Sequence, residues 1–477
     1  MSRETSTLLL VHDADQVYAG VGIYEPFRRP TVTLTARAGR KRSSNTWLVG
    51  AALDDAVASA PDDVHVVYPL QDGDVRDWDA MVALWSYVLV ECLEVRVASN
   101  AYFVMLALPS PLSRDAYERS AQIFFEMFNV PALCIGEVPL MDTYAVGLLN
   151  AMVVTVGWEE TSVVAIGECA VLPGAGVLSK IGLTHCTWWL AFLLAQDAET
   201  GAALRTLAPH DTDAAALELA HQLVEEGHVY VDANAAGNAI VTDQENGDED
   251  TFDVAAALVE GRERDVVEER QRQKGESAAQ ESDVSDVVRV HFRGAQVSVG
   301  RVRGRFHEPL LHPQLLERVQ LSVRAPAAVV QALRAQRIGG EPACLALPDA
   351  ALLVVNNVQP PERRPVLWDS LVLPGPATCI RGLTAEFLRA FATLVTTEQT
   401  EAGQLVGEPN PVQPHSVRAH KFPDYFAEFK ERMDLAAYLG ATIYAKLVFG
   451  DLSGRNYITK LQYNEGGPAM AYALGSG

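Results

Sequence analysis

Residues 68–85, with the sequence YPLQDGDVRDWDAMVALW, constrain the fold more than any other segment of the chain. They predict a short extended entry, a polar turn at Asp72-Gly73 and then a helix. Asp77 is a plausible N-cap, because its carboxylate can accept hydrogen bonds from the first helical turn. Three apolar residues at spacings of three and four then share one helix face, namely Trp78, Met81 and Trp85. We therefore expect a capped amphipathic helix.

The remaining chain alternates between strands and helices. Strands are predicted at 8–12, 31–35 and 102–108, and two further strands, 153–154 and 162–166, are predicted to be joined by a turn. Ser113 is predicted to cap a helix that continues to Phe128. This alternation indicates an α/β fold. At 477 residues the chain exceeds a single hydrophobic core, so we expect at least two lobes.

The charge balance limits the partners. The chain carries 61 acidic and 38 basic side chains, a formal net charge of −23, which argues against a DNA-tracking surface and favours a basic partner segment. We interpret the basic loop Arg37–Arg42 as a solvated loop, so no direct specific nucleic-acid binding is expected. His185-Cys186 is interpreted as core rather than as a metal site.

No segment is predicted to enter a membrane, because the most apolar run, near residues 188–195, is too short to span one. The six scattered cysteines are expected to be buried thiols, so we expect a soluble intracellular protein. Residues 243–288 are crowded with acidic side chains and poor in aromatic ones, which is typical of a mobile insertion.

Several segments resemble actin and the actin-related proteins. Residues 68–85 resemble the actin block YPIxxGxxxxWDxMxxxW, and residues 103–133 and 457–468 resemble LLTEAPLNPxxxRExMxxIxFExFNxPA and WITKxEYxExGP. Residues 438–442 (YLGAT) and 294–306 resemble WIGGS and GQVITIGxERF. The blocks occur in the same order as in actin, so the chain is identified as a member of the actin family.

This resemblance implies two lobes of mixed sheets with flanking helices around a central cleft. The first lobe would comprise residues 1–146 and 436–477, with 31–61 as its small outer subdomain. The second would comprise 147–435, with 182–318 as its outer subdomain, which contains the acidic insertion. In the family, this cleft binds Mg-ATP between two glycine-bearing hairpins whose backbone N–H groups hold the phosphates.

Both phosphate hairpins look degenerate. Actin's DNGSG corresponds to a stretch around residues 11–20 that lacks the glycines, and Asp13 or Asp15 would sit where phosphate should lie. Actin's DSGDG corresponds to residues 155–159, where Gly157 alone is retained. Thr155 cannot replace the carboxylate that organises the metal, and Trp158 adds bulk against the phosphate path.

Two further nucleotide motifs depart from the family pattern. The segment 132–147 is interpreted as the helix that carries actin's water-positioning Gln, and that position is Val138. In the adenosine loop, 373–382, Gly375 is retained and Pro376 replaces a glycine. The resemblance therefore implies a pseudo-ATPase with no catalytic residues, metal or cofactor, while weak ATP binding through adenine and ribose contacts stays open.

Degenerate motifs and a charged insertion resemble the divergent nuclear actin-related proteins, in particular the fungal subunit of SWI/SNF and RSC remodellers. The resemblance implies a nuclear scaffold that forms a heterodimer with a second actin-related protein on the helicase-SANT-associated helix of the remodeller ATPase. Other remodeller subunits are expected as further partners. The groove for that helix would be lined by Tyr144, Gly147, Ile443, Tyr444, Leu447 and Phe449.

Alternatives stay open at this point. The same groove residues could simply form core between the lobes. The chain could instead belong to the dynactin pointed end or a histone acetyltransferase complex, or act as a weakly active actin-fold ATPase. The last alternative needs an acidic residue on the second hairpin, and Thr155 and Trp158 argue against it.

Overall fold

The computed structural model describes residues 6–13, 15–71, 73–231, 287–319, 344–394, 416–451 and 456–475. Contacts divide the chain into two compact units, residues 1–189 with 307–477, and residues 190–306. The predicted acidic insertion, 243–288, lies outside the described residues except for its last two. The predicted lobe and subdomain boundaries stay predictions.

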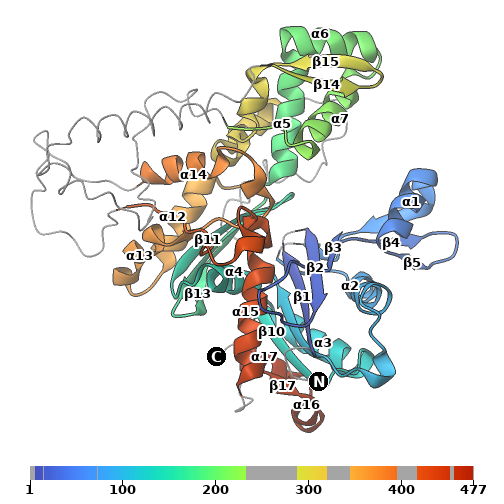
Figure 1. Ribbon diagram of the computed structural model, residues 1–477. Coiled ribbons are helices and arrows are strands. Elements are labelled where there is room, and N and C mark those ends of the chain that lie inside the picture. Colours follow the sequence, from blue (N-terminus) through green and yellow to red (C-terminus); the bar gives the residue numbers. More distant parts are fainter. Residues whose placement is uncertain are drawn as a thin grey trace, which may run out of the picture. The chain divides into compact units, whose positions relative to one another are not determined.

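The larger unit contains a six-stranded mixed sheet in the order β17-β10-β9-β1-β2-β3 (Figure 1). Neighbours β1, β9 and β10 are parallel, and the other pairs are antiparallel. Along β1, Leu8 and Leu10 pack into one core cluster whereas Leu9 and Val11 pack into another, because successive side chains of a strand face opposite sides. The strands are β1 (Thr7–Asp13), β2 (Gln16–Val21), β3 (Val32–Thr35), β9 (Phe103–Leu108), β10 (Ala132–Glu137) and β17 (Ile458–Thr459).

Helices α2 (Trp78–Ser86) and α3 (Arg114–Gln122) contribute to the core on the Leu8 side. The predicted caps are confirmed: the Asp77 carboxylate accepts from the Ala80 N–H at 2.9 Å, and the Ser113 hydroxyl accepts from the Ala116 N–H at 3.1 Å. The helix predicted to run to Phe128 continues from α3 as π-helical turns over Ile123–Met127. Before α2, the short antiparallel strands β7 (Leu70–Gln71) and β8 (Asp74–Val75) flank the predicted turn, of which Asp72 lies outside the described residues.

Helices α4 (Val138–Val146) and α15 (Ala436–Gly450) cover the Leu9 side and run side by side (Figure 1). They meet backbone to backbone: a Cβ atom on Gly440 would lie 1.7 Å from the Met141 carbonyl oxygen, so only glycine fits there. The prediction of a helix over 132–147 was wrong at its start. Residues Ala132–Glu137 form β10 and pair with β9, because a short apolar run becomes a strand where a partner strand is available.

A second, four-stranded sheet has the order β13-β12-β11-β16, in which three antiparallel strands are joined by β16 parallel to β11. Its strands are β11 (Ala151–Val156), β12 (Thr161–Gly167), β13 (Ala170–Ser179) and β16 (Leu371–Val372). Helix α12 (Leu347–Asn357) packs on β12 and β13, and α13 (Arg364–Asp369) packs on β11. Helix α4 contacts strands of both sheets, so it lies between them.

The larger unit also has a small sheet, β5-β4-β6, beside helix α1. Its remaining elements are β4 (Ala38–Lys41), β5 (Trp47–Leu48), α1 (Ala51–Ser59), β6 (Val64–Val67), α10 (Glu308–Leu311), α14 (Leu383–Ala392), α16 (Lys460–Gly466) and α17 (Ala469–Gly475). Helix α5 (Leu183–Gln196) leads into the smaller unit, which holds α6 (Ala198–Leu207), α7 (Thr212–Glu225), β14 (Val288–Phe292) and β15 (Ala295–Val299). Within the described ranges, none of the helices has the length and apolarity needed to cross a bilayer.

The predicted apolar face of α2 is anchored by a buried polar contact. Trp85 is fully buried, and its indole N–H donates to His12 Nε2 on β1 at 2.7 Å. Burial lowers the pKa of His12 to about 3, so the ring is neutral and can accept this bond. Trp78, on the same face, is only half-buried.

Replacing Trp85 with phenylalanine should leave His12 Nε2 buried without a donor. We expect Trp85→Phe to lower the free energy of unfolding by about 1–3 kcal/mol, measured by urea denaturation. The matched control is Trp78→Phe, which lies on the same helix without this bond and should cost clearly less. Equal losses in the two variants would contradict the role assigned to the Trp85–His12 contact.

Candidate functional site

The first candidate element is the turn between β1 and β2. Asp13 pairs with Gln16 across this hairpin, so two residues separate the last paired positions. Asp13, the last residue of β1, is 3% exposed, and Asp15 lies half-buried at the tip. A two-residue turn with an acidic side chain cannot wrap backbone N–H groups around a phosphate as a glycine-rich loop does.

The second element is the turn between β11 and β12. The last strand pair is Val156 with Thr161, and the Gly157 N–H closes the turn by donating to the Glu160 carbonyl at 2.9 Å. Thr155 is buried in β11, and Trp158 is half-buried in the turn. The hairpin predicted from residues 153–154 and 162–166 is therefore confirmed.

The two turns are in direct contact. The Trp158 backbone N–H donates to Asp15 Oδ2 at 3.0 Å. Burial raises the pKa of Asp15 to about 6; this hydrogen bond opposes the shift, and the charges of Glu159 and Glu160 add to it. The structure thus brings together Asp15 and Trp158, two of the residues predicted at the nucleotide site. The Asp15 carboxylate accepts the hydrogen bond of the Trp158 backbone N–H.

A buried pair of carboxyl groups lies behind the first turn. Burial raises the pKa of Asp13 to about 7, with further contributions from Asp434 and Asp15. Asp142, on α4, is fully buried, and burial together with the neighbouring Asp13 raises its pKa well above the ordinary value. Asp13 Oδ1 and both carboxylate oxygens of Asp142 have no hydrogen-bond partner within the described structure. Burial therefore favours the protonated, uncharged form of both groups.

Two cationic side chains near these acids, Arg432 and Lys180, are paired. The Arg432 guanidinium donates twice to the Asp434 carboxylate, at 2.8 and 2.7 Å. The Lys180 ammonium lies 3.0 Å from Glu160 Oε2. Among residues of described position, no cluster of three or more His, Cys, Asp or Glu side chains is arranged to hold a metal ion.

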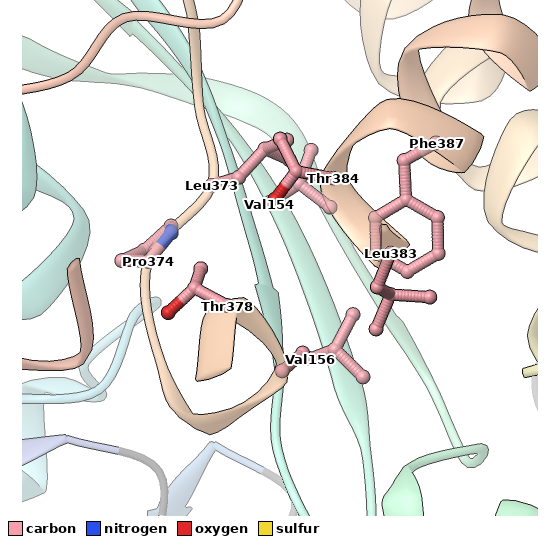
Figure 2. Close-up of a pocket in the computed structure, with 9 residues that line it drawn as sticks. Val154, Val156, Leu373, Pro374, Thr378, Leu383, Thr384 and Phe387 are labelled. Atoms are coloured by element: carbon pink, nitrogen blue, oxygen red, sulfur yellow. The ribbon is translucent and has the colours of Figure 1, made fainter. Parts of the chain in front are cut away.

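The predicted adenosine loop borders a small apolar pocket (Figure 2). Gly375 has φ +86°, and a Cβ atom at this position would lie 3.1 Å from Thr155 Cγ2, so the loop approaches β11 closely there. The empty space in this pocket, including the part open to solvent, is about 200 Å³. Pro376 begins a 3-10 turn beside this pocket. The lining comes from β11, the loop and α14, namely Val154, Val156, Leu373, Pro374, Ala377, Thr378, Leu383, Thr384 and Phe387.

Val138 is the first residue of α4 and is 4% exposed. Its side chain belongs to the core cluster that also contains Val11 of β1. It therefore has a packing role at a position where the resemblance implied a water-positioning side chain.

The predicted partner groove maps to the ends of α4 and α15, where five residues define what we call the α4–α15 surface: Tyr144, Gly147, Ile443, Tyr444 and Leu447. The rings of Tyr144 and Tyr444 pack with centroids 5.0 Å apart, and Leu447 is 58% exposed. Gly147 is the exposed left-handed cap of α4. Phe449, the sixth predicted residue, is 2% exposed and packs against Phe103 and Tyr457, so it belongs to the core.

Sequence reasoning missed two acids of this site. Asp142 could have been found, because it is the one charged residue within the apolar helix Val138–Val146. Asp434 had no such signal, because it lies in an irregular, polar segment far from Asp13 along the chain.

The buried carboxyl pair predicts a pH-dependent stability. The folded chain keeps protons on Asp13 and Asp142 that the unfolded chain releases above about pH 4, so these groups lower the free energy of unfolding increasingly as pH rises from about 4 toward 7. We expect Asp142→Asn to raise the free energy of unfolding by about 1–3 kcal/mol at pH 8, with a smaller gain at pH 5. Thermal melts across this range measure it, with the exposed Asp115→Asn as control. A gain that does not vary with pH would contradict the assignment.

Comparison with known proteins identifies the family of this chain. The profile of the actin family matches residues 24–472. The chain is similar to the SWI/SNF and RSC complexes subunit arp9 of Schizosaccharomyces pombe, with 24% identity over 441 residues, covering 85% of this chain and 78% of the relative.

Shorter matches are more identical. Actin-related protein 4 of Arabidopsis thaliana is 30% identical over 134 residues, covering 28% of this chain and 30% of the relative. Centractin of Saccharomyces cerevisiae is 34% identical over 132 residues, covering 28% of this chain and 34% of that protein. The chain therefore spans about a third of the length of these two proteins. The family profile, in contrast, extends over nearly the whole chain, and the chain belongs to the actin family.

Proposed function

We propose that this chain is a non-catalytic, actin-related subunit of a SWI/SNF-class chromatin-remodelling complex and acts in the nucleus. The observation that carries the proposal is the similarity to a SWI/SNF and RSC subunit along 85% of the chain. The shorter matches, to actin-related protein 4 and centractin, cover 28% of the chain each and are too local to favour another assembly.

The geometry of the hairpin turns supports the absence of catalysis. Asp15 occupies a backbone donor of the second hairpin, and Asp13 and Asp142 add buried acidic groups behind it. Thr155 has no charge with which to organise a metal ion and its waters. ATP turnover is therefore assigned to another subunit of the complex, and this chain has a structural and regulatory role.

The α4–α15 surface is proposed to bind the long helix of the remodeller ATPase. It presents aromatic and aliphatic side chains, of which Leu447 is the most exposed, and such surfaces bind the apolar face of amphipathic helices. A net charge of −23 suits a basic partner segment, because complementary charge speeds association. A second actin-related protein is proposed to bind the same helix beside this chain.

The experiment that tests the assembly is affinity purification of the tagged full-length chain from nuclear extract, followed by mass spectrometry. Recovery of a Snf2-type ATPase with a second actin-related protein is expected. Recovery of dynein-adaptor or acetyltransferase subunits in their place would contradict the assignment to a remodeller while leaving the family membership intact.

The purified chain is expected to release no phosphate from Mg-ATP above the rate of a protein-free blank. The reason is that the metal-organising carboxylate and the water-positioning side chain are replaced by Thr155 and Val138. A phosphate-release assay measures this, with conventional actin in parallel as a positive control. One phosphate released per chain would contradict the proposal.

Leu447→Asp is expected to weaken binding of the remodeller ATPase helix at least about tenfold, because a charge would be desolvated at an apolar contact. The fold should be unaffected, since Leu447 is 58% exposed. Leu352→Asp is the matched control, because Leu352 is 39% exposed on α12, outside the α4–α15 surface. Titration of the purified chain with the helix measures the effect. Full-strength binding by Leu447→Asp would exclude this surface.

A further inference from the structure

The peptide unit that joins Gly157 to Trp158 is hydrogen-bonded on both sides: its carbonyl accepts from the Leu183 N–H at 2.9 Å, and its N–H donates to Asp15. The carbonyl of the next peptide unit, that of Trp158, accepts from the Thr184 N–H at 2.8 Å. Leu183 and Thr184 begin α5, and the first N–H groups of a helix have no partner within it. In a trans peptide the N–H points away from its carbonyl, so the Trp158 N–H is directed away from α5, toward Asp15.

The side chains of the same turn have other partners. Glu159 Oε1 accepts from the Thr184 hydroxyl at 2.9 Å, and Glu160 forms its ion pair with Lys180. Gly182 has no room for a side chain, because a Cβ atom would lie 2.4 Å from the Trp158 carbonyl oxygen. The start of α5 therefore fixes the turn and leaves the Trp158 N–H for a partner from outside this hairpin.

Asp15 is itself held in place by its backbone. Its carbonyl accepts from the Ala36 N–H at 2.7 Å, and the hairpin pair Asp13 with Gln16 lies directly beside it. Asp15 is not among the residues with positive φ, so other side chains can adopt its backbone conformation. The carboxylate is thus an oxyanion delivered to a backbone N–H, the same chemistry by which hairpins and helix ends bind phosphate oxygens.

We propose that the Asp15 carboxylate is a built-in substitute for a nucleotide phosphate, which ties the first hairpin to the second and occupies the donor that a phosphate would use. This rests on the proposed function, in which no nucleotide is turned over at this site. The bond joins a turn of the six-stranded sheet to a turn of the four-stranded sheet, so the connection between them comes from the chain itself.

A second contact links the segment after β2 to a segment that begins beside β16. Phe27, which follows β2, stacks on Phe426 at 5.8 Å, and Arg29 Nε donates to the Glu428 carbonyl at 2.6 Å. The segment holding Phe426 begins beside β16, where the His420 N–H donates to the Leu371 carbonyl. Loss of the Asp15 bond should therefore open the hairpin contact locally, without unfolding the protein.

Hydrogen–deuterium exchange of the full chain, with fragmentation that isolates the Trp158 amide, tests the proposal. We expect Asp15→Ala to speed exchange of this amide about tenfold, because a charge-assisted hydrogen bond is lost. Asp15→Asn keeps an acceptor oxygen and should stay within about twofold of the unmodified chain. Glu160→Gln is the matched control: it removes an acid from the same turn, keeps the bond, and should leave this exchange unchanged.

Unchanged exchange in Asp15→Ala, with a normal melting temperature, would overturn the proposal. So would an equal acceleration in Glu160→Gln, because the effect would then come from charge in the turn rather than from the Asp15 bond. Either result would leave the remodeller assignment standing. Conversely, failure to recover a remodeller ATPase with the tagged chain would contradict the proposed function without changing the exchange of Trp158.

Discussion

Helices α4 and α15 touch through their backbones, and much of the larger unit is organised around that contact. Gly440 permits it, since any side chain there would overlap the Met141 carbonyl. Helix α4 contacts strands of both sheets, while α15 packs on β1 and β9. One close helix pair thus sets the separation of the two sheets at its level, and the β1–β2 and β11–β12 turns extend from strands that this pair contacts. A distance of 3.0 Å between Asp15 and Trp158 depends on that spacing.

The residues of helix α4 lie in three different environments. Val138 at its start is part of the core, Asp142 in its middle is buried near Asp13, and Tyr144 near its end reaches the α4–α15 surface. Helix α4 is buried on most of its surface, against different partners on different sides. The amphipathic periodicity of its sequence therefore does not indicate which residue contacts which partner. A charged residue within such a helix is informative for that reason, since burying Asp142 without a partner has a free-energy cost that local packing does not offset.

Local signals in the sequence predicted much of the fold. Asp77 and Ser113 act as caps, because N-capping depends on a few neighbouring atoms, and the hairpin of β11 and β12 followed from two apolar runs with a turn between them. The family was predictable because its blocks are long and keep their order. The helix assigned to 132–147 failed because β9 supplies a partner strand, and Phe449 was placed at the surface although it packs on Phe103 and Tyr457. Both errors concern tertiary neighbours, which periodicity alone does not specify.

At the hairpin turns, the sequence shows which motif residues are absent, but not which contacts the remaining residues form. The sequence indicated which glycines and carboxylates were missing, but it could not indicate that Asp15 would meet a peptide N–H 143 residues away. The direction of that N–H is set by α5, whose first N–H groups bind the carbonyls of Gly157 and Trp158. A backbone donor so oriented needs an acceptor, because an unpaired buried N–H is costly. In a nucleotide-binding relative the acceptor can be a phosphate, whereas here it is a side chain of the same chain. The contact with Asp15 therefore supplies the hydrogen bond that this N–H requires.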